Sequence, residues 1–260
     1  MQRELCWLIT SKCNANCKFC HFFDNKYEDL SLEQNSIILN NLYSSNITHI
    51  VWSGGEALQY VEIEKLLKKS HELKIINSVI SNGYLPLYIS NSIFENIDEL
   101  VLSLDSINDK TNTKIGRGHS SRKNVCSTMK RAKATNPNIK IRINSVISKA
   151  NLNEIEEIAE FINKQDINSW RLHKFAPIRA KALLNKDEFE ITNTEYNKAV
   201  NLCKKTCRDI LIETRYDNNY NDMYILITPN GDIIKTNNYI DEVIGKASNL
   251  EDLKKSWQTT

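Results

Sequence analysis

Short apolar runs rich in β-branched residues alternate along the chain with segments whose apolar residues recur at helical spacing. A capping box formed by Ser31 and Gln34 is predicted to open one helix. Asn153 is predicted to cap another, in which Ile155 and Ile158 share one face. The six runs predicted as strands are residues 5–10, 49–53, 75–80, 99–104, 140–147 and 170–175.

Six strand–helix repeats predict parallel strands joined by right-handed crossovers. A complete eight-fold barrel usually takes about 250 residues, so the repeats indicate an α/β fold with a partial (β/α)6 TIM-like barrel. After the sixth strand the rhythm changes, and the predicted elements are a helix near 194–206, a strand near 209–214 and a hairpin over 224–234. We expect the partial barrel in residues 1–180 and a C-terminal α/β extension in residues 181–260 that closes the active site.

Polar and reactive residues directly follow several of the predicted strands. In parallel α/β folds, ligands bind at the carboxyl ends of the strands. We therefore expect one rim to carry residues 13–20, residues 54–56, Asn82, Ser103 and Asn144. Residues far apart in the sequence would then face one cavity.

The balance of charges narrows the function classes. The 34 basic and 32 acidic residues give a formal charge of +2, which argues against a dedicated nucleic-acid or membrane-surface protein. No apolar stretch approaches the roughly 18 residues of a membrane span, and we identify no signal peptide. Seven cysteines without a secretory signal indicate a reducing compartment, expected to be the cytoplasm, where thiols serve metals or catalysis.

Three of the cysteines lie close together just after the first predicted strand. Cys13, Cys17 and Cys20 are spaced so that one loop can fold around a compact metal cluster. Three thiolates satisfy three irons of a 4Fe–4S cubane, which takes four cysteines in simple electron carriers. The missing thiolate leaves one iron open, and an open position distinguishes catalytic from structural metal sites. A structural zinc site that includes His21, or a disulfide, remains an alternative.

The cysteine spacing resembles the signature of the radical S-adenosylmethionine (SAM) superfamily, with Phe19 at the aromatic position before the last cysteine. Gly54, Gly55 and Glu56 match the superfamily's GGE motif, whose backbone grips the SAM amino group. Paired glycines permit close backbone approach to a ligand, and Glu56 adds a negative charge suited to an ammonium group. Without the cysteines, this tripeptide would more often be an ordinary turn.

The resemblance implies a 4Fe–4S cluster on Cys13, Cys17 and Cys20, with SAM bound to the open iron. Reduction of the cluster, by an electron donor such as flavodoxin or ferredoxin, cleaves SAM to a 5′-deoxyadenosyl radical. That radical abstracts a hydrogen atom from a small-molecule substrate, while the protein positions the reactants and excludes water.

A closer resemblance, to the viperin-like family, runs from about residue 13 to residue 147. The motifs that carry it are residues 81–83, 103–106, 115–118 and 143–147. The SAM contacts that the resemblances imply are Phe19, Gly54, Gly55, Glu56, Asn82, Ser103 and Arg117. Arg117 would pair with the SAM carboxylate as a fork, and a solvated loop arginine is the alternative.

Viperin-like enzymes use a nucleoside triphosphate, often CTP. Removal of the ribose 4′ hydrogen and loss of the 3′ hydroxyl as water give a 3′-deoxy-3′,4′-didehydro nucleotide, and the resemblance implies a role in antiviral defence. The implied substrate contacts are His49, Arg142, Asn144 and Arg171. The resemblance also implies that Tyr224 returns a hydrogen atom, although an ordinary strand tyrosine is the alternative.

A triphosphate calls for several converging cations, and here the match is incomplete. Arg142 stands where the family has a lysine, and Arg171 keeps a positive charge. His49 and Ser169, however, replace a lysine and an arginine. Cations that could compensate are Lys174, Arg179 and Lys181.

Two other functions stay open. Residues 175–177 and 228–232 resemble the tails of radical SAM enzymes that modify peptides or other small substrates. Such enzymes often carry a second cluster, but Cys203 and Cys207 offer too few ligands, so core roles are favoured for them. The third hypothesis is a non-catalytic, metal-bearing interaction module. The nucleotide base, the reductant and the oligomeric state are not determined by the sequence.

Overall fold

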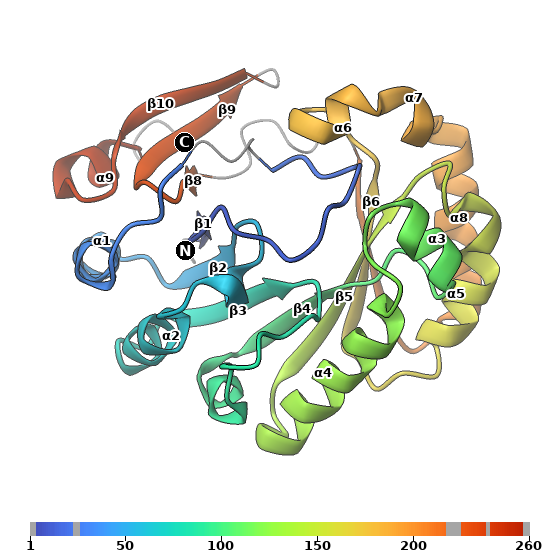
Figure 1. Ribbon diagram of the computed structural model, residues 1–260, viewed down its shortest axis with the longest axis horizontal. Helices are drawn as coiled ribbons and strands as arrows, with labels where there is room; N and C mark the ends of the chain where they lie inside the picture. The colour runs from blue at the N-terminus through green and yellow to red at the C-terminus, as the bar shows by residue number, and fades with distance from the viewer. Residues whose placement is uncertain (1–3, 23–26, 217–224, 238–239, 257–260) are drawn as a thin grey trace.

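The computed structural model describes residues 4–22, 27–216, 225–237 and 240–256, and it contains one ten-stranded sheet (Figure 1). Strands β1 to β7 are parallel neighbours in chain order. Their bounds are β1 (Glu4–Leu8), β2 (His49–Ser53), β3 (Ile76–Ser81), β4 (Glu99–Ser103), β5 (Lys140–Ile147), β6 (Ser169–Lys174) and β7 (Leu211–Arg215). The strand order is linear, so the strands in these ranges do not close into a complete barrel.

Helices connect the parallel strands and form an arc along the outer side of the curved sheet (Figure 1). They are α1 (Leu32–Ser44), α2 (Ile63–Glu72), α3 (Asp109–Lys114), α4 (Ser121–Thr135), α5 (Ile155–Ile162) and α8 (Asn193–Thr206). Three short 3-10 helices, η1 (Ala57–Gln59), η2 (Asn91–Asn96) and η3 (Leu152–Glu154), complete the connections. Parallel strands with helical crossovers confirm the predicted α/β partial barrel.

The C-terminal part of the chain contributes to both edges of the sheet. Strand β7 continues the parallel order beyond β6, whereas β8 (Ile225–Ile227) pairs in parallel with β1 at the other edge. Strands β9 (Asp232–Asn237) and β10 (Ile240–Lys246) follow as antiparallel neighbours, and α9 (Leu250–Ser256) packs beside them. Helices α6 (Ala180–Leu184) and α7 (Lys186–Phe189) follow β6. The sheet is continuous across residue 180, and the domain boundary there stays a prediction.

Alternation along the strands separates an apolar outer face, packed against the helices, from an inner face that carries both polar and apolar side chains. Trp7 of β1 stacks on Trp52 of β2 with ring centroids 5.0 Å apart, and both are fully buried in the core that includes the helices. Glu4, Cys6 and Leu8, at the alternate positions of β1, line a cavity inside the partial barrel. Side chains at every second strand position therefore reach the inside of the sheet.

Most predicted element bounds agree with the structure within two residues, and the capping box of Ser31 and Gln34 is present. The first strand ends at Leu8, earlier than predicted, because the next residues turn toward Asp29. Strand β10 was not anticipated, because its side chains are half-buried or exposed and lack a continuous apolar face.

The predicted cap at Asn153 is wrong. Helix α5 begins at Ile155, Glu154 occupies the N-cap position, and no side chain caps the helix. The polar side chain that organises this turn is that of Asn151, whose amide donates to the Asp105 carbonyl at 2.7 Å and to the Val146 carbonyl at 2.8 Å. Buried hydrogen bonds to the sheet, and not a side-chain cap on helix α5, therefore organise this turn.

Candidate active site

The three clustered cysteines line one cavity of about 430 Å³ at the carboxyl ends of β1 to β4. Cys13 is exposed, Cys17 is buried and Cys20 is half-buried. Also lining this outer cavity are Gly54, Gly55, Glu56, Asn82, Ser103 and Arg117. The structure therefore brings the predicted cluster ligands and six of the seven predicted SAM contacts together, while Phe19 lines a neighbouring cavity.

The arrangement of the cysteines bears on the kind of metal centre. Among the described residues, no three side chains of His, Cys, Asp or Glu converge on a single metal position. A cubane makes a different demand, because each thiolate bonds a different iron atom. Three thiols spread around one cavity fit that demand, and the cavity leaves room for a further ligand. The donor set thus suits a 4Fe–4S cluster with SAM better than one zinc ion.

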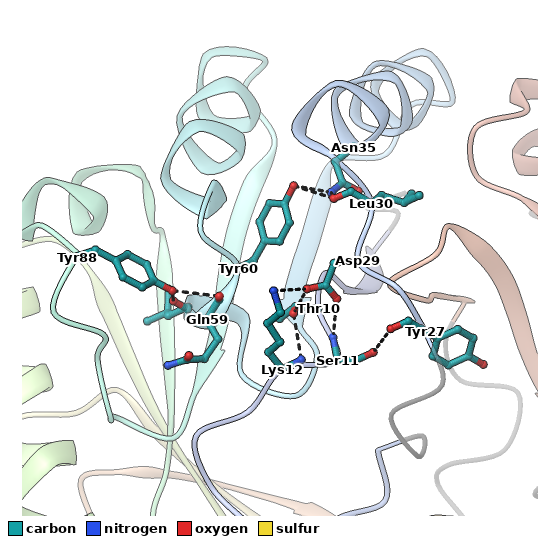
Figure 2. A network of polar contacts seen from close by, with 11 residues as sticks. Thr10, Ser11, Lys12, Tyr27, Asp29, Leu30, Asn35, Gln59, Tyr60 and Tyr88 are labelled. Carbon is teal, nitrogen blue, oxygen red and sulfur yellow. Dashed lines mark hydrogen bonds and ion pairs between the residues drawn. The ribbon is translucent and has the colours of Figure 1, made fainter.

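A polar network fixes the chain on either side of the cysteine loop (Figure 2). Asp29 accepts a hydrogen bond from the Thr10 hydroxyl at 2.6 Å and another from the Ser11 N–H at 2.9 Å. The Tyr60 hydroxyl donates to the Leu30 carbonyl at 3.0 Å and holds the returning chain near helix α1. The loop therefore leaves β1 in a fixed direction.

Two glycines allow the cysteine loop to approach other backbone segments closely. The Gly55 N–H donates to the Thr10 carbonyl at 2.8 Å, and a Cβ at Gly55 would lie 2.4 Å from the Lys12 carbonyl oxygen. From the other side, Gly116 (φ +84°) accepts from the Asn16 N–H at 3.0 Å, and its Cβ would lie 2.1 Å from the Asn16 oxygen. The sequence motif predicts that the backbone at Gly55 approaches a ligand closely. In the structure, part of this close approach is to the backbone of the cysteine loop.

Aromatic packing anchors the loop near its last two cysteines. The Phe19 ring contacts Phe189 with centroids 5.6 Å apart, and Phe175 contacts Phe189 at 5.7 Å. Cys17 belongs to the same apolar cluster. A hydrogen bond of 3.1 Å from the Ala182 N–H to the Cys20 carbonyl ties helix α6 to the loop. The segment after β6 therefore covers this side of the loop.

Burial changes the acidity of the loop thiols. It raises the pKa of Cys17 to about 11 and also raises the pKa of Cys13. The Arg117 guanidinium opposes both shifts. Because cysteines bind metal as thiolates, positive charge is needed near these sulfurs, and a bound iron–sulfur cluster would supply it.

The carboxylate of Glu56 is buried and serves the backbone. It accepts hydrogen bonds from the Leu58 N–H at 3.3 Å and from the Asn82 N–H at 2.7 Å, and burial raises the pKa of Glu56 to about 7. The Asn82 side chain donates to Asn14 at 2.8 Å. Both predicted SAM contacts therefore also hold the ends of β2 and β3 against the cysteine loop.

Arg117 lies between the two cavities and is held in a fixed orientation. Its Nε donates to Asp105 Oδ2 at 2.5 Å, and its guanidinium carbon lies 5.3 Å from the centre of the Phe19 ring. Ser103 lines both cavities, and its hydroxyl has no hydrogen-bond partner within the described part of the chain. An oriented guanidinium beside an available hydroxyl is suited to binding a ligand carboxylate.

An inner cavity of about 370 Å³ lies inside the partial barrel and shares a wall with the outer one. The residues lining both include Cys17, Cys20, Ser103 and Arg117. Asn144 of β5 lines the inner cavity, and its buried Oδ1 has no hydrogen-bond partner among the described residues. A buried acceptor of this kind is costly unless a ligand satisfies it.

The predicted substrate contacts His49, Arg142 and Arg171 also line the inner cavity, toward the amino ends of the strands. Each has an acidic partner. His49 lies 2.9 Å from Glu4, Arg142 donates to Glu99 at 2.9 Å, and Arg171 makes bonds of 2.9 and 2.6 Å with one oxygen of Glu213.

Sequence reasoning missed the three glutamates. Glu4 lies directly opposite His49 across β1 and β2, and Glu213 lies opposite Arg171 across β6 and β7. Period-two alternation could have found them, because inner-face positions of neighbouring strands share a register.

Burial of His173 predicts an acid-sensitive fold. Desolvation, followed by the charge of Arg171, lowers the pKa of His173 to about 3, well below its ordinary value. The unfolded chain therefore binds one more proton between about pH 6.5 and pH 3, and stability falls as the pH drops through that range. The free energy of unfolding of the holoprotein, measured by chemical denaturation, should fall between pH 7 and pH 5. In His173→Gln this fall is expected to be about 2 kcal/mol smaller than in the wild type. Exposed His71→Gln is the control, and equal losses in all three proteins would contradict the prediction.

The remaining candidate residues have other positions. Tyr224 lies outside the described residues, so its role stays a prediction. Arg179 pairs with Asp241, and Lys181 hydrogen-bonds to Asn16. Cys203 and Cys207 are buried in the hydrophobic core, consistent with the favoured core roles.

No helix in the described ranges is both long and apolar enough to cross a membrane. Among solved structures, the chain resembles Streptococcus suis SuiB bound to precursor peptide SuiA, with a TM-score of 0.69 at 20% identity over 90% of this chain and 59% of that one. It also resembles anSMEcpe with bound AdoMet and Cp18Cys peptide, with a TM-score of 0.73 at 15% identity over 97% of this chain and 80% of that one. At these identities the likeness shows the fold.

Sequence comparisons show that the chain is also similar to proteins named as enzymes. Two relatives are named S-adenosylmethionine-dependent nucleotide dehydratase. The one from Flammeovirga pacifica is 27% identical and covers 89% of this chain and 83% of its own. The one from Selenomonas ruminantium is 26% identical and covers 91% of this chain and 87% of its own. The profile of the Radical SAM superfamily matches residues 7–162. The chain therefore belongs to the radical SAM superfamily, whose enzymes use a 4Fe–4S cluster and SAM.

Proposed function

We propose that this chain is a radical SAM enzyme that dehydrates the ribose of a nucleotide, a nucleoside triphosphate such as CTP, UTP or GTP, to its 3′-deoxy-3′,4′-didehydro form. The observation that carries the proposal is the shared wall of the two cavities, where Cys17, Cys20, Ser103 and Arg117 line both. A substrate in the inner cavity thus lies next to the cysteine side without an intervening layer of protein. The names of two relatives, matched over about nine-tenths of this chain, support a nucleotide substrate.

The residues of the site have different roles in the proposed reaction. Cys13, Cys17 and Cys20 hold the cluster, and Arg117, oriented by Asp105, pairs with the carboxylate of SAM. The cofactors, once bound and reduced, supply the 5′-deoxyadenosyl radical that removes the ribose 4′ hydrogen.

The inner cavity orients the substrate. Asn144 Oδ1, which has no partner among the described residues, accepts a hydrogen bond from the substrate. The aromatic packing of Phe19 on Phe189 limits water at the cysteine loop, which protects a reactive intermediate from side reactions. Tyr224 is proposed to return a hydrogen atom to the product.

A substrate screen on anaerobically reconstituted, reduced holoenzyme tests the proposal. The compounds are CTP, UTP, GTP and ATP, together with the corresponding monophosphates and nucleosides. At least one is expected to raise the rate of 5′-deoxyadenosine formation by about tenfold or more and to lose one water. A substrate deuterated at C4′ should transfer deuterium to 5′-deoxyadenosine.

Different outcomes would identify the alternatives. If no nucleoside or nucleotide changes the rate, while a peptide encoded beside this chain's gene does, the chain is a peptide-modifying enzyme. If reconstitution yields one zinc per chain and no SAM cleavage, the chain is a non-catalytic module. About four irons per chain with SAM cleavage agrees with an enzyme.

A further inference from the structure

His49, on β2 and in the wall of the inner cavity, has a partner at each of its two ring nitrogens. Its Nδ1 lies 2.9 Å from a carboxylate oxygen of Glu4, which is directly opposite on β1. Its Nε2 lies 2.8 Å from the hydroxyl of Ser78 on β3. The side chain is 12% exposed, so contacts with the two neighbouring strands fix the orientation of the ring.

These contacts decide which ring nitrogens carry a proton. The Ser78 hydroxyl donates its one hydrogen to Glu99 Oε2 at 2.8 Å, so toward His49 it can only accept. The hydrogen bond with His49 lowers the pKa of the Glu4 carboxyl, so Glu4 is ionised near pH 7 and is also an acceptor. A neutral imidazole has a single N–H, whereas an imidazolium has two. Two acceptors therefore require the charged form of His49.

The charge of His49 alters the balance at the end of the inner cavity that lies toward the amino ends of the strands. The charged residues in the described lining there are Arg142, Arg171 and Glu4, in addition to His49. The other carboxylates that contact the two arginines do not belong to this lining. Protonation of His49 thus raises the excess of positive charge from one to two. Converging cations are what a phosphate chain requires.

The other titratable groups of the described lining keep one charge state near neutral pH at this place. Burial raises the pKa of Cys6, the next residue on the same face of β1, to about 12, so this thiol stays neutral. Burial lowers the pKa of His21 to about 4 and that of His173 to about 3, so both rings are neutral. Arginines keep their charge. A change of charge near neutral pH is ordinary for histidine, and His49 is the histidine of this lining that is held in the charged form.

Arg142 supplies a second sign that an anion binds beside His49. Its Nε is a buried donor without a partner among the described residues, although the same guanidinium donates to Glu99 and lies 3.8 Å from Glu213. A buried donor of this kind is costly unless a ligand satisfies it. A phosphate oxygen only accepts, so it suits both the Arg142 Nε and the ring N–H groups of His49.

We infer that His49 is an imidazolium that binds the phosphate chain of the substrate, so that binding of a nucleoside triphosphate is linked to the protonation of this one side chain. The inference rests on the proposed function and adds its regulation by pH. His49 stands where the resembling family has a lysine, and by this inference the positive charge is retained near neutral pH but is lost at alkaline pH. Linkage is reciprocal, so bound phosphate also favours the protonated ring.

Calorimetry of the holoenzyme with inorganic triphosphate, between about pH 6.5 and pH 8.5, tests the link to protonation. The comparison is with His49→Lys, because lysine keeps its charge up to about pH 10. The ligand has the same protonation state in both experiments, so the ratio of the two Kd values isolates His49. Relative to His49→Lys, the wild type is expected to bind about tenfold more weakly at the alkaline end than at the acidic end.

Kinetics with the nucleotide identified by the substrate screen give a second measurement. His49→Gln keeps a hydrogen-bonding side chain without the charge, and near pH 7 it should raise KM by about tenfold or more. The loss should fall on KM rather than on kcat, because the phosphate chain is bound equally in the ground state and the transition state. His71→Gln, at an exposed position of α2, is the control and should match the wild type.

Nitrogen-15 spectra of histidine-labelled holoprotein report the charge of the ring directly, and the signal of His49 is the one lost in His49→Lys. Both ring nitrogens are expected to be protonated at about pH 6.5. A neutral ring at that pH, no saturable binding of inorganic triphosphate, or a Kd ratio that does not change with pH overturns the inference and leaves the dehydratase proposal standing. A screen in which no nucleotide is turned over refutes the proposed function, while the spectra and calorimetry still decide the charge of His49. If circular dichroism shows that His49→Gln is unfolded, the wild type and His49→Lys suffice for both.

Discussion

Replacement of Cys17 with alanine is expected to abolish SAM cleavage, with a loss of more than about 10³-fold in 5′-deoxyadenosine formation. Cys17 lines both cavities and lies within the apolar cluster of Phe19, so its sulfur is the most enclosed of the three predicted ligands. Without it, two thiolates remain to hold the cluster. Iron and acid-labile sulfide after anaerobic reconstitution should fall together with activity.

The matched control is Cys126→Ala. Cys126 is half-buried in helix α4 and lines neither cavity. The Cys126→Ala variant should retain the iron content and the SAM cleavage of the wild type. If Cys17→Ala keeps both properties, the assignment of the cluster to this loop is wrong.

Gly116→Ala is expected to lower SAM cleavage by about 10²-fold, because displacement of a catalytic group by about 1 Å costs that much. The new Cβ would lie 2.1 Å from the Asn16 carbonyl oxygen, which belongs to the backbone between two cluster cysteines. Since backbone atoms cannot rotate away as a side chain does, the cysteine loop must move. The electron paramagnetic resonance spectrum of the reduced cluster with and without SAM, together with the iron content, reports that movement.

Gly118→Ala separates loop displacement from backbone strain. Gly118 also has a positive φ, +95°, so alanine there has a similar conformational cost of about 1–2 kcal/mol. Its Cβ would meet the Tyr84 hydroxyl at 2.7 Å, the far end of a side chain that can shift. Gly118→Ala should therefore retain most SAM cleavage. Equal losses in the two variants would show that strain alone accounts for the effect.

The local sequence carries enough information for the parallel part of the fold. Short apolar runs rich in β-branched residues identify β2 and β5 with their observed bounds, and the capping box at Ser31 locates the start of α1. The rule that ligands bind at carboxyl ends of strands correctly gathers the cysteines, Asn82 and Ser103 around one cavity. These features depend on short stretches of sequence, so they can be read without knowledge of the tertiary structure.

The partners of the charged residues could not be predicted in the same way. Arg142 is recognisable as a cation, but Glu99 and Glu213 lie 43 and 71 positions away along the chain, on β4 and β7. Their proximity follows from strand register and from the position of β7 beside β6, which is a tertiary property. Likewise, the contact of Gly116 with Asn16 becomes visible only when the loop is folded. Long-range pairing therefore decides the electrostatics that a motif leaves open.

The placement of β7 and β8 on opposite edges of the sheet has a consequence for the integrity of the whole molecule. Exposed edges of a sheet present unpaired N–H and C=O groups that can recruit other chains. In this fold, residues after 180 cover β6 on one side and β1 on the other. If the polypeptide were interrupted near residue 180, by proteolysis or early termination, β1 and β6 would both become exposed edge strands that can pair with other chains. Resistance to aggregation thus rests on the last third of the chain, far in sequence from the cysteines.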